Sequence, residues 1–263
     1  MQEPVVVLSP HLDDAVLSAW HVLSSPRDVT IVTVFAGVPE PGLLTDLDRS
    51  HGAGDSGAWL TRRRQEDRAA FAVAGRDPVH LDLLEVQFPA YRIPRLRDAI
   101  ARAPERFLEL VADDPELRSD PDALAALVRP HIPPGAVVYG PAGIGGHPDH
   151  RDLAQATVLL DGDVRLYADS PYYLRLGLPS WAGHGGEPEL AADAWVMTAL
   201  SRLDAKLTGP EVAELSPDVF DQKVAAMRCY TTEFPAIWRD ASRPPAEPGM
   251  MRFEPTWVVA GGR

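Results

Sequence analysis

The stretch VVVLSPHLDDAV, residues 5–16, joins an apolar run directly to one histidine and two adjacent aspartates. Four consecutive aliphatic residues, 5–8, are typical of a strand that is buried on both faces of a sheet. The residues from 14 to 23 then carry apolar side chains at helical spacing. The stretch therefore predicts a strand, a turn that carries His11, Asp13 and Asp14, and a helix.

The rest of the chain continues this alternation of strand and helix. A β-branched run at 29–35 completes a βαβ unit, the run at 135–142 predicts another buried strand, and the segment 164–174 predicts a further strand with tyrosines at its end. Strands that alternate with helices favour a parallel sheet. We therefore expect an α/β chain with a Rossmann-like three-layer fold, in which helices cover both faces of a mostly parallel sheet. The sequence contains no internal repeat and no linker, so we expect one domain over residues 1–263.

The composition excludes several classes of partner. The formal net charge is −13, from 38 acidic and 25 basic residues, so the average field repels a phosphate backbone and we expect no nucleic-acid partner. No apolar run approaches the ~20 residues that span a bilayer, and the first residues do not resemble a secretion signal. We expect a cytoplasmic protein that acts on a small molecule; the sequence leaves the oligomeric state open.

Two motifs combine histidine with aspartate, and each follows a predicted strand. SPHLDD, 9–14, follows the first strand, and GGHPDH, 145–150, follows the strand at 135–142. Ligands of an open parallel sheet bind at the carboxyl ends of its strands, so both motifs are expected at one edge. The side chains expected to converge there are His11, Asp13, Asp14, His147, Asp149 and His150.

Either motif alone has a simpler interpretation, because aspartate is a common helix N-cap and turn residue. The occurrence of both motifs at strand ends favours a functional site instead. Neutral imidazole and carboxylate are ligands that suit zinc, and also iron and other first-row divalent ions.

Three segments of the sequence together resemble the LmbE/PIG-L family of zinc-dependent N-deacetylases. SPHLDDA is similar to the family's N-terminal His-x-Asp-Asp signature, and GGHPDHRDL is similar to its His-Pro-Asp-His signature. Between them, RRRQEDRAAFAVAG resembles the family's Arg-x-x-Glu helix, with Arg63 and Glu66 at the motif positions. The resemblance covers roughly residues 4 to 160.

The resemblance implies a reaction and a role for each motif residue. It implies that His11, Asp14 and His150 bind Zn²⁺ and that Asp13 is the general base. It also implies that His147 assists the transition state, oriented by Asp149. The expected substrate is an N-acetylated amino sugar or glycoside, with Arg63 as a substrate-binding residue. A zinc-bound water would attack the acetamide carbonyl.

Two other functions stay open at this point. A 2-His-1-carboxylate set could hold Fe²⁺ for oxygenase chemistry, although the doubled aspartate and the parallel α/β pattern argue against it. A non-catalytic sugar-binding module is the second alternative.

The sequence departs from the family's usual pattern at three positions. Leu12 and Ala15 stand where the family often has proline and glutamate, and Gly145 stands where some relatives have tyrosine. The residue that stabilises the oxyanion in those relatives is therefore either missing here or supplied from elsewhere, with Tyr139, Tyr172 and Tyr173 as the candidates. The loops at 39–57 and 240–256 are candidates for covering the site.

Overall fold

The structure is a computed structural model that describes residues 3–182, 190–233 and 248–260. Its sheet has seven strands in the order β3-β2-β1-β4-β5-β7-β6. The first five are parallel, β7 is antiparallel to β5, and β6 is antiparallel to β7. The strand bounds are β1 Val5–Ser9, β2 Val29–Thr33, β3 Val79–His80, β4 Val137–Pro141, β5 Asp163–Tyr167, β6 Lys206–Glu214 and β7 Phe253–Ala260.

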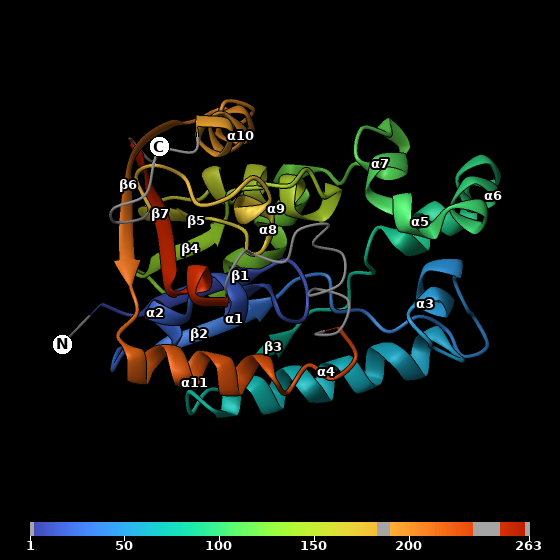
Figure 1. Ribbon diagram of the computed structural model, residues 1–263, viewed down its shortest axis with the longest axis horizontal. Helices are drawn as coiled ribbons and strands as arrows, with labels where there is room; N and C mark the ends of the chain where they lie inside the picture. Colours follow the sequence, from blue (N-terminus) through green and yellow to red (C-terminus); the bar gives the residue numbers. More distant parts are fainter. Residues whose placement is uncertain (1–2, 183–189, 234–247, 261–263) are drawn as a thin grey trace.

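Helices cover both faces of this sheet, as Figure 1 shows. Helices α4 (Ser56–Ala72) and α11 (Pro217–Met227) lie side by side along one face, and α1 (Asp14–Ser18) packs against α11. Helices α8 (Pro121–Val128) and α9 (Pro148–Val158) pack together on the other face. The remaining α-helices are α2 Trp20–Leu23, α3 Asp46–Ser50, α5 Gln87–Arg92, α6 Pro94–Arg102, α7 Phe107–Val111 and α10 Leu190–Leu200. The predicted α/β class and its mostly parallel sheet are confirmed.

Strand β1 is the middle one of the five parallel strands and explains where a ligand site forms. All five of its residues are buried, and it pairs in parallel register with β2 on one side and β4 on the other. The chain moves outward from β1 through β2 to β3, and then crosses back to place β4 and β5 on the opposite side. In open parallel sheets, a reversal of strand order of this kind is where ligands bind, which here is at the carboxyl ends of β1 and β4.

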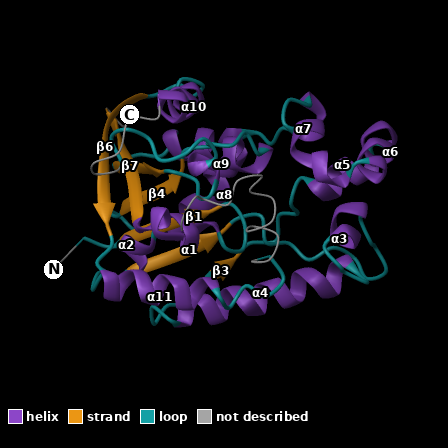
Figure 2. Cartoon of the chain, in the orientation of Figure 1, coloured by secondary structure: helices purple, strands orange, loops and turns teal. Residues whose placement is uncertain are grey.

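A small helical lobe projects beyond those carboxyl ends. Helices α5, α6 and α7 form it, at the right of Figure 2, and it is inserted between β3 and β4. The lobe has its own apolar cluster, made by Val86, Ala90, Leu96, Ile100, Phe107, Val111 and Leu117. One member of this cluster, Phe107, has its ring 6.4 Å from the ring of His147. The lobe therefore forms one wall of the region where the two motifs meet.

Several elements differ from the sequence-based expectation. Strand β6 and helix α10 were not predicted, because β6 is a largely exposed edge strand and α10 is apolar over more than one face. The segment 39–57 was expected as a loop, but it contains α3, which Thr45 caps by accepting the N–H of Asp48. Of the second expected loop, residues 240–247 lie outside the described residues. Within the described part of the chain, no helix combines the length and apolar character needed to cross a bilayer.

Candidate metal centre

The turn after β1 places its two aspartates differently. The carboxylate of Asp14 turns back and accepts the backbone N–H of His11 at 2.8 Å. Asp13 occupies the N-cap position of α1, but its side chain makes no capping hydrogen bond. Its φ angle is +133°, a region that non-glycine residues rarely adopt and that costs roughly 1–3 kcal/mol. The simpler interpretation, in which an aspartate serves as the cap, therefore does not fit.

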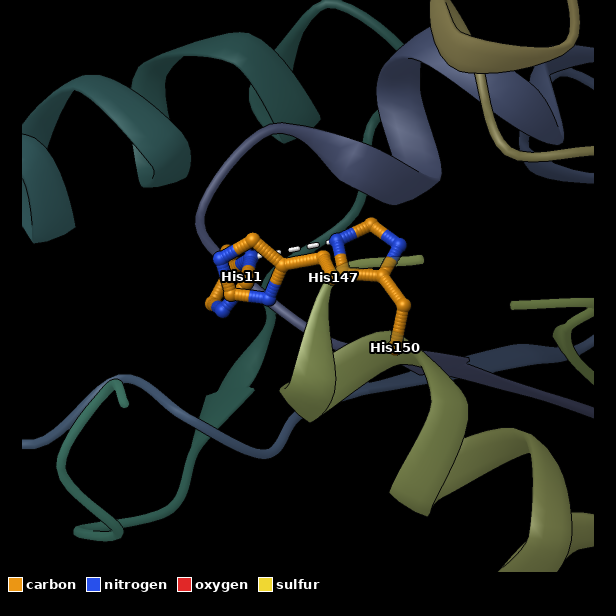
Figure 3. A group of neighbouring side chains, drawn as sticks. All are labelled: His11, His147 and His150. Atoms are coloured by element: carbon orange, nitrogen blue, oxygen red, sulfur yellow. Dashed lines mark hydrogen bonds between the residues drawn. The ribbon is translucent and has the colours of Figure 1, made fainter. Parts of the chain in front are cut away.

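Three ligand atoms from the two motifs converge on one point. The Nδ1 of His11 lies 3.3 Å from Oδ2 of Asp14 and 3.2 Å from Nε2 of His150. The same Nε2 lies 3.1 Å from Oδ2 of Asp14. His11 comes from the turn after β1, and His150 from the first turn of α9, as Figure 3 shows. The structure thus brings His11, Asp14 and His150 together from positions about half the chain apart.

The spacing of these atoms fits a metal ion. Ligands that lie ~2.1 Å from a tetrahedral zinc are about 3.4 Å from one another. The three separations of 3.1–3.3 Å are close to this value. His147 completes a wider group, since one ligand atom from each of His11, His147 and His150 lies within 4.8 Å of the others. Two imidazoles and a carboxylate with this spacing are a donor set that suits zinc or iron.

Each of the two converging histidines is held by a second carboxylate. The Nε2 of His11 donates to Asp149 Oδ2 at 2.8 Å, and the Nδ1 of His150 donates to Asp169 Oδ1 at 2.7 Å. A carboxylate accepts in each of these bonds, so the inner nitrogens, His11 Nδ1 and His150 Nε2, can serve as ligands once they are deprotonated. Backbone N–H groups of Ala142 and Ile144 fix the other oxygen of Asp169. Asp169 was not among the predicted site residues, although it follows β5 at the same edge of the sheet.

Asp149 of the second motif lies closer to His11 than to His147. Its Oδ2 bonds His11 and the N–H of Val86, and lies 3.9 Å from the Nδ1 of His147, so the expected orientation of His147 by Asp149 stays a prediction. The Nδ1 of His147 is buried and has no hydrogen-bond partner among the described residues. Burial lowers the pKa of His147 well below its ordinary value, and the neighbouring His11 and His150 lower it further. A neutral imidazole at the centre's edge is therefore favoured over the protonated form.

The environment separates the proton affinities of the two adjacent aspartates. Burial raises the pKa of Asp13 well above its ordinary value, and the charge of Asp14 adds to this rise. Burial also opposes ionisation of Asp14, but the charges and hydrogen bonds of His150 and His11 hold its pKa well below the ordinary value. A pair of carboxyl groups with opposite shifts is typical of sites in which one binds and the other exchanges a proton.

Arg63 lies in α4 and is buried rather than displayed to solvent. Its Nη1 donates to Glu85 Oε1 at 2.8 Å, and its Nε lies 3.4 Å from Glu233 Oε1. Burial opposes its charge, but Glu233 and Glu85 together keep its pKa above the ordinary value. The structure thus places Arg63 close enough to Asp13 for their charges to interact, in the wall of the site.

Of the three candidate tyrosines, only Tyr172 makes a described ring contact with a residue of the centre. Its ring lies 5.5 Å from that of His150, edge to face. It also fills the space beside Gly145, where an added Cβ would come within 2.5 Å of the Tyr172 ring. The Tyr173 hydroxyl donates to the carbonyl of Phe253, and Tyr139 packs with His21 and Arg165.

Comparison with known families identifies the class to which this site belongs. The sequence profile of the PIG-L family, described as GlcNAc-PI de-N-acetylase, matches residues 6–160. The match spans more than half of the chain and contains both motifs, so the chain belongs to the PIG-L family. It is accordingly an enzyme of the deacetylase type, an amide hydrolase. No curated protein sequence matched the chain.

Solved structures of similar fold include other deacetylases. A deacetylase of the teicoplanin biosynthesis pathway, solved as a bog complex, shares 25% identity and a TM-score of 0.64, and the alignment covers 98% of both chains. The A40926 pseudoaglycone deacetylase Dbv21 is 23% identical, with a TM-score of 0.61 and coverage of 98% of both chains. The 4-carboxy-2-hydroxymuconate hydratase GalB from Pseudomonas putida KT2440 is 17% identical, with a TM-score of 0.50. The alignment covers 99% of this chain and 97% of the hydratase chain. The same fold therefore serves more than one reaction, and the residues of the site have to decide the chemistry.

Proposed function

We propose that this enzyme removes the N-acetyl group from an amino sugar, or from a metabolite that contains one. We also propose that the divalent metal it uses is zinc. The observation that carries the proposal is the convergence of His11 Nδ1, Asp14 Oδ2 and His150 Nε2 within 3.3 Å of one another, with Asp13 beside them. Three protein ligands leave a coordination position open for water, as in catalytic zinc sites. Membership of the PIG-L family supports hydrolysis of an N-acetyl amide.

His11, Asp14 and His150 would hold the ion, and Asp149 and Asp169 would orient the two imidazoles. When bound, zinc supplies a water whose pKa is lowered to about 7 and polarises the acyl carbonyl. Asp13 is the group placed to accept the proton of that water, because its carboxyl is not engaged in capping and its pKa is raised by burial. Asp13 would return this proton to the departing amine.

His147 and Tyr172 lie beside the three proposed ligand side chains and are the candidates for stabilising the developing oxyanion. His147 presents a buried Nδ1 that has no hydrogen-bond partner among the described residues, and the ring of Tyr172 lies edge to face against that of His150. A positioned donor of this kind is worth roughly a hundred- to a thousandfold in rate. Arg63 would contact the polar groups of the sugar from the wall that it shares with Glu85.

The glycopeptide deacetylases of similar fold favour a sugar carried on a larger molecule as the substrate class. One such structure is described as the zinc-inhibited form of teicoplanin deacetylase Orf2, so the metal requires direct measurement. The same donor set would also hold Fe²⁺.

The decisive experiment measures metal content by elemental mass spectrometry and acetate release from N-acetyl amino sugars. We expect about one zinc per chain in the wild type, and its loss in a His11→Ala, His150→Ala double variant, with acetate release falling more than about a thousandfold. Iron together with substrate-dependent oxygen uptake would replace the hydrolase with an oxygenase. A protein that binds no divalent metal would be a binding module.

A further inference from the structure

Helix α4 buries charged side chains where most helices bury an apolar stripe. Arg63, Glu66 and Asp67 stand three and four residues apart, so they share one face, and all three are buried. A buried charge is costly unless it is paired and hydrogen-bonded. The groups that satisfy these three side chains therefore determine how α4 is placed.

Each of these three side chains has a partner in one short segment that follows α11, and Asp67 also bonds His80 while Arg63 also bonds Glu85. The hydroxyl of Tyr230 donates to Asp67 Oδ1 at 2.8 Å. The hydroxyls of Thr231 and Thr232 donate to the two oxygens of Glu66, each at 2.6 Å, and the N–H of Thr232 adds a bond of 3.2 Å. Glu66 thus binds two consecutive residues with both of its oxygens.

The fourth residue of the segment reaches the wall of the metal centre. Glu233 lies 3.4 Å from the Nε of Arg63, whose Nη1 binds Glu85 on its other side. Beyond Glu85, the N–H of Val86 donates to Asp149, the carboxylate that holds His11. Arg63 therefore lies between two carboxylates that come from distant segments, Glu85 and Glu233. Glu85 is followed in the chain by Val86, whose N–H bonds the carboxylate that holds His11.

We propose that Glu66 is a positioning residue that binds Tyr230–Glu233, here called the latch, and so fixes Arg63 at the substrate side of the metal centre. The inference deepens the proposed function and rests on it for the choice of substrate. The metal-facing side chains have their own carboxylates, Asp149 and Asp169, so release of the latch leaves the metal bound. Release disturbs Arg63, and with it the contacts that hold the sugar before and during reaction.

Two variants remove the hydrogen bonds of the latch with little change of shape. Thr232→Val removes the hydroxyl that donates to the buried carboxylate of Glu66. Glu66→Gln removes the negative charge of the group that accepts this hydrogen bond. We expect each to raise KM about tenfold, which corresponds to one charge-assisted hydrogen bond, with kcat within about threefold of wild type and metal content unchanged. Thr232→Ser restores the hydroxyl and is expected to restore KM, which a purely steric or folding defect would not predict.

Matched controls are available elsewhere in the chain. Thr198→Val removes a hydroxyl that bonds only its own helix at Ala194, and Glu211→Gln removes an exposed carboxylate on β6. Both are expected to retain wild-type KM and kcat. A wild-type KM in Thr232→Val and Glu66→Gln, or a Thr232→Ser variant as impaired as Thr232→Val, would overturn the proposal.

Hydrogen–deuterium exchange separates a failure of the latch from a failure of the proposed function, because it needs no substrate. Peptides that cover 228–233 and 83–90 are expected to exchange faster in Thr232→Val and Glu66→Gln than in wild type, whereas those from α9 keep their protection. Unchanged exchange in 228–233 would refute the latch even in an active deacetylase. Faster exchange in a protein that releases no acetate would retain the latch and refute the reaction.

Discussion

Two of the buried clusters of charged groups differ in how completely their members satisfy one another. In the first, here called the closed cluster, Glu254 accepts the N–H groups of Trp20 and His21, the ring of His21, and the ammonium of Lys223. Lys223 donates a second bond to the carbonyl of Met251 at 2.8 Å. Donors and acceptors match, and the charges of Glu254 and Lys223 cancel.

The metal centre shows the opposite balance. The outer nitrogens of its two histidines bond Asp149 and Asp169, so the two inner ring nitrogens and the Asp14 carboxylate face one another. Burial disfavours a charge on His150, yet Asp14 and Asp169 raise its pKa to about 9. The arrangement therefore favours a positive charge at its centre. A buried cluster whose charges and hydrogen bonds are satisfied within the cluster indicates a structural role. A buried cluster that is stabilised by an added cation indicates a ligand site.

The largest expected effect separates catalysis from metal binding within the centre. Asp13→Asn leaves the three converging side chains in place and removes the carboxylate that we propose accepts a proton. We expect kcat to fall by roughly a hundred- to ten-thousandfold, with metal content at the wild-type level. Steady-state acetate release and elemental analysis of the same preparation test this. Unchanged acetate release in the metal-loaded variant would contradict the role of Asp13.

The next effect lies in the closed cluster and concerns stability alone. Lys223→Met leaves Glu254 buried without its ammonium partner, which is expected to lower the free energy of unfolding by about 3–5 kcal/mol. Urea denaturation measures this loss, and Lys206→Met on the exposed edge strand is the matched control. A loss below about 1 kcal/mol, or a loss of bound metal, would show that the two clusters are not distinct in function.

The pH dependence of stability offers a third test. Although burial opposes ionisation of Glu254, the charge of Lys223 and the bonds from His21 lower its pKa from 4.5 to about 2. A carboxyl group whose pKa is lowered on folding stabilises the protein above pH 4.5, and that stability is lost as pH falls towards 2. We expect the advantage of wild type over Glu254→Gln to decline by about 3 kcal/mol over this range. Urea denaturation at several pH values measures it; a constant difference would contradict the prediction.

A smaller effect concerns the outer carboxylates of the metal centre. Asp169→Asn keeps the shape of the side chain but weakens the bond that orients His150, and we expect zinc affinity to fall by about ten- to a hundredfold. Competition with a chelating dye gives the affinity, and Asp163→Asn at the exposed start of β5 is the control. Equal affinity in the variant and the wild type would leave Asp169 without a role at the metal.

Much of this organisation was predictable because it depends on local patterns. The aliphatic runs of β1, β2 and β4 fixed the parallel core, and the rule that ligands bind at the carboxyl ends of strands placed His11 and His150 at one edge. Asp169 follows the same rule, but no histidine stands near it in the sequence, so the pattern of paired residues did not reveal it.

The partners of Asp149 and Glu66 were not predictable for a different reason. Asp149 is two residues from His147 in sequence, yet the first turn of α9 directs its carboxylate to His11, 138 residues away. Glu66 binds residues 165 and 166 positions further along the chain. Such contacts depend on how helices are placed across the sheet, and neither composition nor periodicity encodes that placement.

The positive φ of Asp13 has a consequence for any laboratory that selects this enzyme for heat resistance. Glycine adopts that backbone conformation without steric cost, and it removes a buried carboxyl, so Asp13→Gly is expected to raise the melting temperature by a few degrees. A library screened on survival after heating would therefore enrich glycine at position 13 and discard the proton acceptor. Retaining aspartate there requires a screen that rewards turnover at every round.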